Sequence, residues 1–444
     1  MTGESCLILS IKEFCSMHIS TERPAASAYF HITISQPAAV AGLQKQLLRL
    51  SFLNLFLVSC MGLLLRSFPF LSSFPLQYKN VLHGHSHFAF GGWVMPILLA
   101  LILKIFPDIA QKVAYKHWRN IVYMLFLSAY GMLLSFPVQG YAAVSIFFST
   151  ISVFAGFYLA IVIWKVTQHN TDIAIKFLRA GLVYLVLSSI GPFATGPIMA
   201  MGYTGSPLYH NAIYFYLHFQ YNGWFVFALL AVLYKMLSGK EHHGKRVFVL
   251  FNIACVPAFA LSVLWNEPGI VFNIIGGVAA LLQVAGVVYI VKDIALLQWH
   301  NRFSQSLFTL AIIAFAVKNI LQLASAFPVV AHMAAAYRNF VIAYLHLVLL
   351  GFVSLFAISV ILQVYQFTVS RFIRICFYVF LLAFITTELL LVLNASEVLT
   401  GFPIPHFAGL MLFFTCFFPV AFMGLFKGIG FHSKTTVSAA LASV

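Results

Sequence analysis

Histidines near the starts of apolar segments are the residues in this sequence whose type and spacing suit chemistry. They are His83, His85, His87, His210, His218 and His346. Neutral imidazole binds iron, copper and zinc, so the residue type alone does not choose the metal. Imidazoles that several helices deliver to one layer are what a buried metal or haem site requires. Whether these histidines meet depends on the elements that carry them.

The composition excludes a soluble protein. Of the 444 residues, 62% are hydrophobic and 8% are charged, whereas a soluble domain carries roughly 25% charged residues. The net charge of +15 does not indicate nucleic acid, because the basic residues fall in loops between apolar segments. Six scattered cysteines do not form a disulfide framework. The partner that this composition predicts is membrane lipid.

The apolar segments have the length of transmembrane helices, which need roughly 20 apolar residues to cross about 30 Å of hydrocarbon. Such segments lie near residues 47–70, 81–106, 119–138, 141–164, 178–201, 212–237, 247–266, 269–291, 305–328, 339–366, 374–393 and 405–427. The sequence therefore predicts an all-α fold, a polytopic membrane bundle of about twelve transmembrane helices.

Basic residues mark one side of this bundle. The loops after the even-numbered segments carry most lysines and arginines, whereas the opposite loops hold Arg66, Lys79 and Arg338. Loops rich in Lys and Arg face the cytoplasm. We therefore expect a multi-pass protein of the cell membrane, in particular a bacterial inner membrane, with both termini in the cytoplasm.

The tails differ from the membrane domain. Residues 1–45 contain no apolar run long enough to span and do not look like a signal peptide. We expect them to form a poorly ordered cytoplasmic tail or to precede the natural start. A single membrane domain is predicted at 46–428, followed by a cytoplasmic tail at 429–444.

In this topology the even-numbered helices begin on the outer side, so their early histidines share one level in the outer half of the membrane. At about 100° per residue, His83 and His87 lie on one helix face, and His85 points away from it. In the sixth segment His210 and His218 are two turns apart, with Tyr214 between them. This stripe suits redox or proton chemistry, and equally a hydrogen-bonded pair inside a bundle.

Other histidines are more simply interpreted. His85 and His406 fit interfacial residues near helix ends. Those in the predicted cytoplasmic loops, which we expect to be solvated, are His117, His169, His242, His243 and His300. Glu388 is the only acidic residue well inside a span, which argues against a carboxylate-bridged di-iron site.

Two segments resemble the catalytic subunit of the haem–copper oxidase superfamily, most closely the cbb-type oxidases. That subunit also has twelve spans, and its ligands come from spans 2, 6, 7 and 10. The run HGHSHFAFGGWVMP is similar to its span 2, and the resemblance makes His83 the low-spin haem ligand. The run YHNAIY is similar to the start of span 6, which implies His210 as a copper ligand and Tyr214 as the tyrosine one turn later.

The resemblance is incomplete at the oxygen-reducing site. In YLHLVLLGF, His346 takes the place of the second histidine of the family's HxH motif, which holds the low-spin haem, and Tyr344 replaces the first. The seventh segment has no histidine. The resemblance thus implies a haem b between His83 and His346, whereas copper would need His87 or His218 to rebuild its site. Because tyrosinate can ligate haem iron, the replacement of the first histidine of the HxH motif by Tyr344 does not exclude a second haem.

Cations at the outer side and inside the membrane have two interpretations each. Arg338 and Lys79 suit haem propionates, or they anchor helix ends by snorkelling. Lys318 is costly inside a span and either begins a proton or substrate path or bonds to neighbouring carbonyl groups.

The family resemblance implies an oxidoreductase-like haem protein of the respiratory chain, and whether it is an enzyme stays open. Its activity would be electron transfer, or the reduction or sensing of a diatomic gas (oxygen or nitric oxide), with other respiratory subunits as partners. The alternative is a transporter or metal-handling protein, whose broken helix would lie at Gly191-Pro192 and Gly196-Pro197. A third interpretation is a non-catalytic relic assembled with respiratory subunits.

Overall fold

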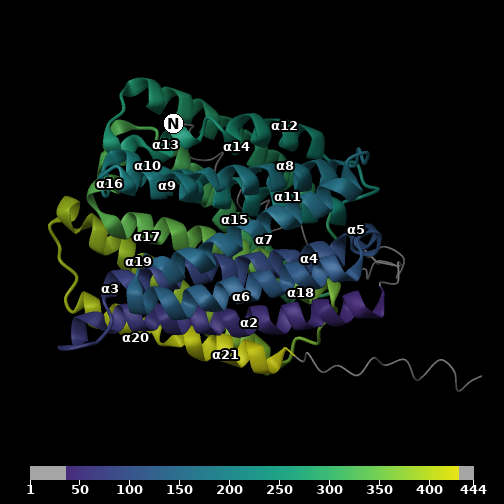
Figure 1. Ribbon diagram of the computed structural model, residues 1–444, viewed down its shortest axis with the longest axis horizontal. Helices are drawn as coiled ribbons and strands as arrows, with labels where there is room; N and C mark the ends of the chain where they lie inside the picture. The colour runs from purple at the N-terminus through teal and green to yellow at the C-terminus, as the bar shows by residue number, and fades with distance from the viewer. Residues whose placement is uncertain (1–36, 430–444) are drawn as a thin grey trace, which may run out of the picture. The chain divides into compact units, whose positions relative to one another are not determined.

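The computed structural model describes residues 37–429, apart from the side chains of residues 398–400. The predicted tails therefore lie almost entirely outside the described residues. In the described part every predicted segment is helical and no strand occurs. Within residues 37–429, ten helical segments are long and apolar enough to cross a membrane. The predicted all-α membrane bundle is confirmed, and its helices run roughly side by side (Figure 1).

The ten membrane-crossing segments are Ala38–Phe70, Tyr78–Ile105, Tyr115–Gln139, Ala143–Thr167, Ile173–Ala200, Ile270–Ile294, Arg302–Ala324, Arg338–Val364, Arg371–Glu397 and Phe407–Gly428. The predicted sixth and seventh spans lie outside this set. The sixth is a continuous helical run made of α10 (Pro207–His218), η4 (Phe219–Phe225) and α11 (Val226–Met236). The seventh is broken into α12 (Gly244–Cys255), α13 (Phe259–Ser262) and η5 (Leu264–Asn266).

The remaining helices complete the chain. In order they are α2 (Ala38–Ser67), η2 (Phe68–Phe70), α3 (Tyr78–Phe88), η3 (Ala89–Val94), α4 (Met95–Ile105), α5 (Pro107–Lys112), α6 (Tyr115–Gln139), α7 (Ala143–Thr167), α8 (Ile173–Ser188), α9 (Ile190–Ala200), α14 (Ile270–Ile294), α15 (Arg302–Ala324), α16 (Pro328–Ala336), α17 (Arg338–His346), η6 (Leu347–Ser354), α18 (Leu355–Val364), α19 (Arg371–Thr400), α20 (Phe407–Thr415) and α21 (Phe417–Gly428).

The first helix begins earlier than the sequence predicted. Helix α2 starts at Ala38, directly after Pro37, rather than near residue 47. Pro37 cannot continue a helix towards the N-terminus but suits the position just before one. The additional turns pack on the bundle, where the buried Gln44 donates a hydrogen bond from Nε2 to the carbonyl of Ala100 at 3.2 Å.

The second, sixth and tenth spans share one construction. In each, an α-helical half is followed by a π-helical segment and then by a second α-helical half. The π segments are η3, η4 and η6, and the last two begin directly after His218 and His346. A π segment widens the helix and leaves backbone groups without their usual partners, and such segments recur at functional sites.

Side-chain hydrogen bonds connect the three π segments. Trp93 of η3 donates from its indole nitrogen to Ser354 Oγ of η6 at 2.8 Å. Trp224 of η4 donates to Met95 Sδ, just after η3, at 2.8 Å. Asn54 of α2 donates to the carbonyl of Gly92 at 2.7 Å, which satisfies a backbone group of η3. The three spans are therefore fixed to one another at this level.

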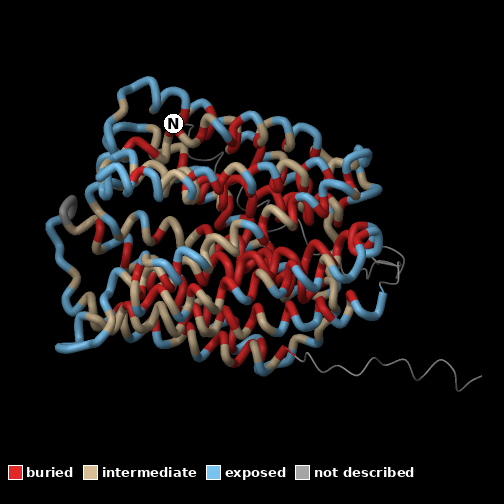
Figure 2. Tube along the Cα trace, viewed as in Figure 1, coloured by how far each residue is buried: buried red, intermediate tan, exposed pale blue. Residues whose placement is uncertain are grey.

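Burial changes at the π segments. Beyond them, every residue of α4 except Lys104, of α11 except Lys235 and of α18 except Val364 is buried. Before them, α10 buries only His218 and α17 only Ala343. Figure 2 shows this contrast as a red core along α4 and α11. The histidine-bearing halves are thus held by a closed core but are only partly buried themselves.

Helix α9 approaches α10 through a glycine. A Cβ on Gly191 would lie 2.4 Å from the carbonyl oxygen of Ala212 and 2.9 Å from Tyr216 Cβ. On the same helix, a Cβ on Gly196 would meet nothing within 4 Å. The close approach of α9 and α10 therefore requires Gly191 but not Gly196.

We predict that Gly191→Ala destabilises the protein and Gly196→Ala does not. The first substitution forces two backbones apart and is expected to cost about 1–3 kcal/mol, the usual range for overpacking. The second places alanine at an open helical site and is expected to be neutral or slightly stabilising. Thermal unfolding of the two purified variants in one detergent checks this, and equal melting temperatures would contradict the packing described.

Candidate functional site

His85 is the histidine of α3 that faces the first span. Its Nδ1 lies 3.1 Å from the carbonyl oxygen of Val58 in α2. Its ring also lies within electrostatic range of His346 and Arg66. An imidazole that donates from Nδ1 to a carbonyl keeps the lone pair of Nε2 free. His85, which the sequence suggested was merely interfacial, therefore interacts electrostatically with the histidine of the tenth span.

His346 is anchored in a similar way. Its Nδ1 lies 3.3 Å from Glu388 Oε1 of α19, and the two side chains are 32% and 16% exposed. In the described part of the chain, no partner is found for Nε2 of either His346 or His85. Histidines that bind a metal usually donate their other ring N–H to a carboxylate or a backbone carbonyl. His85 has a backbone carbonyl at Nδ1, and His346 has a carboxylate within ion-pair distance of the same ring nitrogen.

His83 lies in different surroundings. Its ring contacts Tyr141 edge-on, with centroids 4.7 Å apart, and it interacts electrostatically with Lys79 and Arg338. Both cations are exposed. No hydrogen bond to the His83 ring is found among the described residues. The structure thus brings the predicted ligand His83 near both predicted propionate partners, but without an anchor of the kind that His85 has.

His87 belongs to a separate aromatic cluster. Its Nε2 lies 2.8 Å from the hydroxyl of Tyr141, and its ring stacks on Phe136 at a centroid distance of 4.4 Å. It also lines a pocket that includes Tyr216 and Gln220. With Nε2 hydrogen-bonded, His87 is positioned as part of a polar cluster with Tyr141.

Arg66 is a residue of this site that sequence reasoning placed only among the outer loops. It interacts electrostatically with Glu388 and Tyr78 and lines a pocket of about 410 Å³ between the ends of α2, α3 and α20. The available signal was its position inside the apolar run GLLLRSFPF, where a charged residue is expensive. What the sequence did not show is that Glu388, far away in the chain, lies near it.

His210 and Tyr214 pack on a tryptophan. The centroid of Trp265 is 5.6 Å from that of His210 and 5.9 Å from that of Tyr214. The indole nitrogen of Trp265 donates to Asn211 Oδ1 at 3.1 Å. The predicted copper ligand and the predicted redox tyrosine therefore lie together, against the broken seventh span.

His218 caps that broken span. Helix α12 ends at Cys255, two residues before Pro257, and Cys255 leaves a carbonyl that His218 Nε2 reaches at 2.8 Å. His218 Nδ1 lies 3.1 Å from Asn222 Nδ2 and 3.3 Å from Ser262 Oγ. Inside a membrane every backbone polar group needs a protein partner. Nε2 of His218 serves this purpose, and Nδ1 is engaged by the side chains of Asn222 and Ser262, so neither nitrogen is free for a metal.

A buried hydrogen-bond network continues from His218 to the tenth span. The Lys318 ammonium, 1% exposed, donates to Asn222 Oδ1 and, at 2.7 Å, to Gln322 Oε1. The Tyr344 hydroxyl lies 3.5 Å from the same Gln322 oxygen. Tyr344, which takes the place of the histidine that holds the second haem in the family, is thus directed into this network. Of the two interpretations of Lys318, the structure shows bonding to neighbouring oxygens, which are side-chain amides.

The donor set does not fit a copper centre. Among the described residues, no group of three or more His, Cys, Asp or Glu side chains is placed to hold a metal ion. His210 packs on Trp265, and His218 and His87 use ring nitrogens for hydrogen bonds. His85 and His346, whose Nε2 atoms have no partner among the described residues, are the two side chains that would hold a haem iron.

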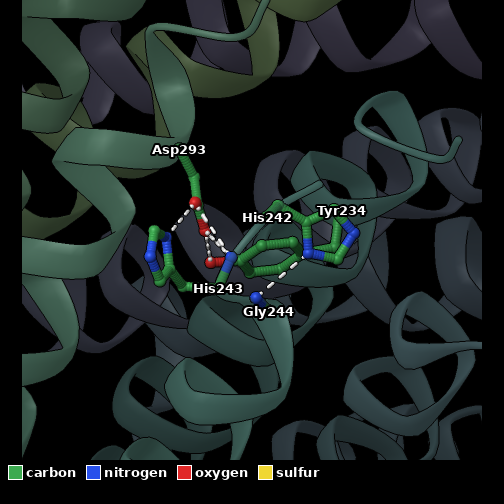
Figure 3. Close-up of polar contacts among 5 residues, drawn as sticks. All are labelled: Tyr234, His242, His243, Gly244 and Asp293. Atoms are coloured by element: carbon green, nitrogen blue, oxygen red, sulfur yellow. Dashed lines mark hydrogen bonds and ion pairs between the residues drawn. The ribbon is translucent and has the colours of Figure 1, made fainter. Parts of the chain in front are cut away.

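At the basic end of the bundle, a second cluster holds a loop in place (Figure 3). Asp293, 1% exposed, accepts hydrogen bonds from the Tyr234 hydroxyl at 2.9 Å and from His243 Nδ1 at 2.7 Å. The backbone N–H of His243 also donates to this carboxylate. His243, which the sequence predicted to be solvated, is therefore tied to the end of α14, although its ring remains 37% exposed.

We predict that Asn222→Leu destabilises the protein by about 1.5–3 kcal/mol, the value of a hydrogen bond to a charged group. The substitution removes one of the two acceptors of Lys318 and the donor to His218. Thermal unfolding of Asn222→Leu, Lys318→Met and the double variant measures the coupling. The loss in the double variant is expected to be smaller than the sum of the single losses, and strictly additive losses would refute a shared network.

Comparisons with known proteins give a structural match and no sequence match. No protein-family model and no curated protein matches this sequence. A chain described as belonging to a heme-copper terminal oxidase dimer, solved by cryo-EM, superposes with a TM-score of 0.63 at 13% identity. The match covers 89% of this chain and 83% of that one. The chain therefore has the fold of that heme-copper terminal oxidase chain.

Proposed function

We propose that this chain is a membrane haem-b protein whose iron is held by His346 and by a histidine of α3. The observation that supports this most directly is that His85 Nδ1 contacts the Val58 carbonyl, His346 Nδ1 lies 3.3 Å from Glu388 Oε1, and the two imidazoles interact electrostatically. This favours His85 over His83, the ligand predicted from the family resemblance. The oxidase fold supports the proposal, since it is known to house such a group.

Electron transfer is the activity that these residues favour. A haem held by two histidines exchanges single electrons and has no open position for a gas. The residues around it orient the two rings: Val58 and Glu388 set which nitrogen of each imidazole faces the site. Reduction or sensing of oxygen or nitric oxide would need a second site, and the Tyr344 hydroxyl is engaged with Gln322.

The surroundings follow from the same proposal. The protein would lie in a cell membrane, in bacteria the inner membrane, with the basic loops and both termini on the cytoplasmic side. Its haem would then lie in the outer half, where Arg66, Lys79 and Arg338 are the cations available for propionates. Other respiratory subunits are the expected partners for receiving or delivering electrons.

We predict that the purified protein contains haem b, seen as a low-spin α-band in the reduced-minus-oxidised spectrum. His346→Ala and His85→Ala are expected to lose this band, because each removes an axial ligand. His83→Ala is expected to keep it. His406→Asn is the matched control, since His406 is exposed and its φ of 55° suits asparagine.

The outcomes separate the alternatives. Loss of the band in His83→Ala together with its retention in His85→Ala would restore His83 as the ligand. Stoichiometric zinc or copper without iron in the wild-type protein would overturn the haem proposal and favour a metal-handling or transport function. Retention of the band in His346→Ala would exclude the site described.

A further inference from the structure

Glu388 is an acidic side chain in the interior of the bundle. It lies within α19 and is 16% exposed. An isolated carboxylate is strongly disfavoured in such surroundings, and a charged side chain inside a span is a sign of function. The reason for a carboxylate here must come from the groups that Glu388 faces.

Two charged or titratable groups face Glu388. His346 Nδ1 of α17 lies 3.3 Å from Oε1, and the Arg66 guanidinium of α2 interacts electrostatically with the carboxylate. In the described part of the chain, Oε1 has no hydrogen-bond partner of good geometry. The carboxylate is therefore directed at one imidazole and is only partly balanced by one cation.

We infer that Glu388 is a positioning residue that sets the reduction potential of the haem through His346, with Arg66 opposing it. This inference rests on the proposed function. A carboxylate beside Nδ1, as Glu388 Oε1 lies at 3.3 Å, polarises the imidazole and makes it a stronger donor through Nε2. Stronger donation and nearby negative charge favour oxidised, more positive iron, so Glu388 lowers the potential. The positive charge of Arg66 acts in the opposite direction.

The experiment is a potentiometric titration of the haem in detergent at one fixed pH. Glu388→Gln keeps the shape and removes the charge, and it is expected to favour the reduced form by about tenfold, which is about 59 mV for one electron. Arg66→Met is expected to lower the potential. Glu388→Asp keeps a carboxylate and should stay closer to the wild type than Glu388→Gln does.

Glu397→Gln is the matched control, because Glu397 lies on the same helix but pairs with Asn394. Its potential is expected to equal that of the wild type. Electron paramagnetic resonance of the oxidised haem gives a second readout, since weaker donation by His346 in Glu388→Gln changes the g-values and a merely structural role would not.

The measurements distinguish an error in the role of Glu388 from an error in the proposed function. A wild-type protein without haem overturns both. A haem present in Glu388→Gln with unchanged potential and g-values overturns only the role of Glu388. If Glu388→Gln does not retain haem, the Arg66→Met titration decides, and an unchanged or raised potential there overturns the inference.

Discussion

The contacts between the three π segments are the constraint on which the rest of this structure depends. Trp93 reaches Ser354, and Trp224 reaches Met95, so the second, sixth and tenth spans are joined at one depth. A lipid environment provides no hydrophobic force between helices, and specific packing and hydrogen bonds must hold them. With the spans fixed there, the halves that carry the histidines need not pack tightly on each other. The closed core at the α4, α11 and α18 ends of these spans thus allows the opposite ends to carry the histidines of a functional site.

The same environment explains why so many polar side chains of this bundle serve the backbone. The break at Pro257 frees the carbonyl of Cys255, and His218 satisfies it. The π segment η3 widens at Gly92, and Asn54 satisfies that carbonyl. A histidine inside a membrane protein therefore has two explanations, a ligand or a backbone partner. The second nitrogen distinguishes them: both nitrogens of His218 are engaged, whereas His85 and His346 each keep one free.

Hydrophobicity and charge were sufficient to predict the helices, because length and apolar content are what a membrane requires. The start of α2 at Ala38 was missed because its first turns include Gln44 and Lys45, which a hydropathy pattern excludes. Helical periodicity correctly predicted that His83 and His85 lie on different faces of their helix. Which face meets the tenth span depends on how α3 packs on α2, beside Val58, and a single sequence does not contain that information.

Charge balance was the least predictable part of the site. Arg66, Glu388, His85 and His346 come from four different spans, and only the fold places them together. Each is expensive in a membrane by itself. As a group they offset one another, since the Glu388 carboxylate interacts with both the His346 imidazole and the Arg66 guanidinium. Removing one member leaves the others with uncompensated charge, so these four residues are best understood as one electrostatic unit built around His346.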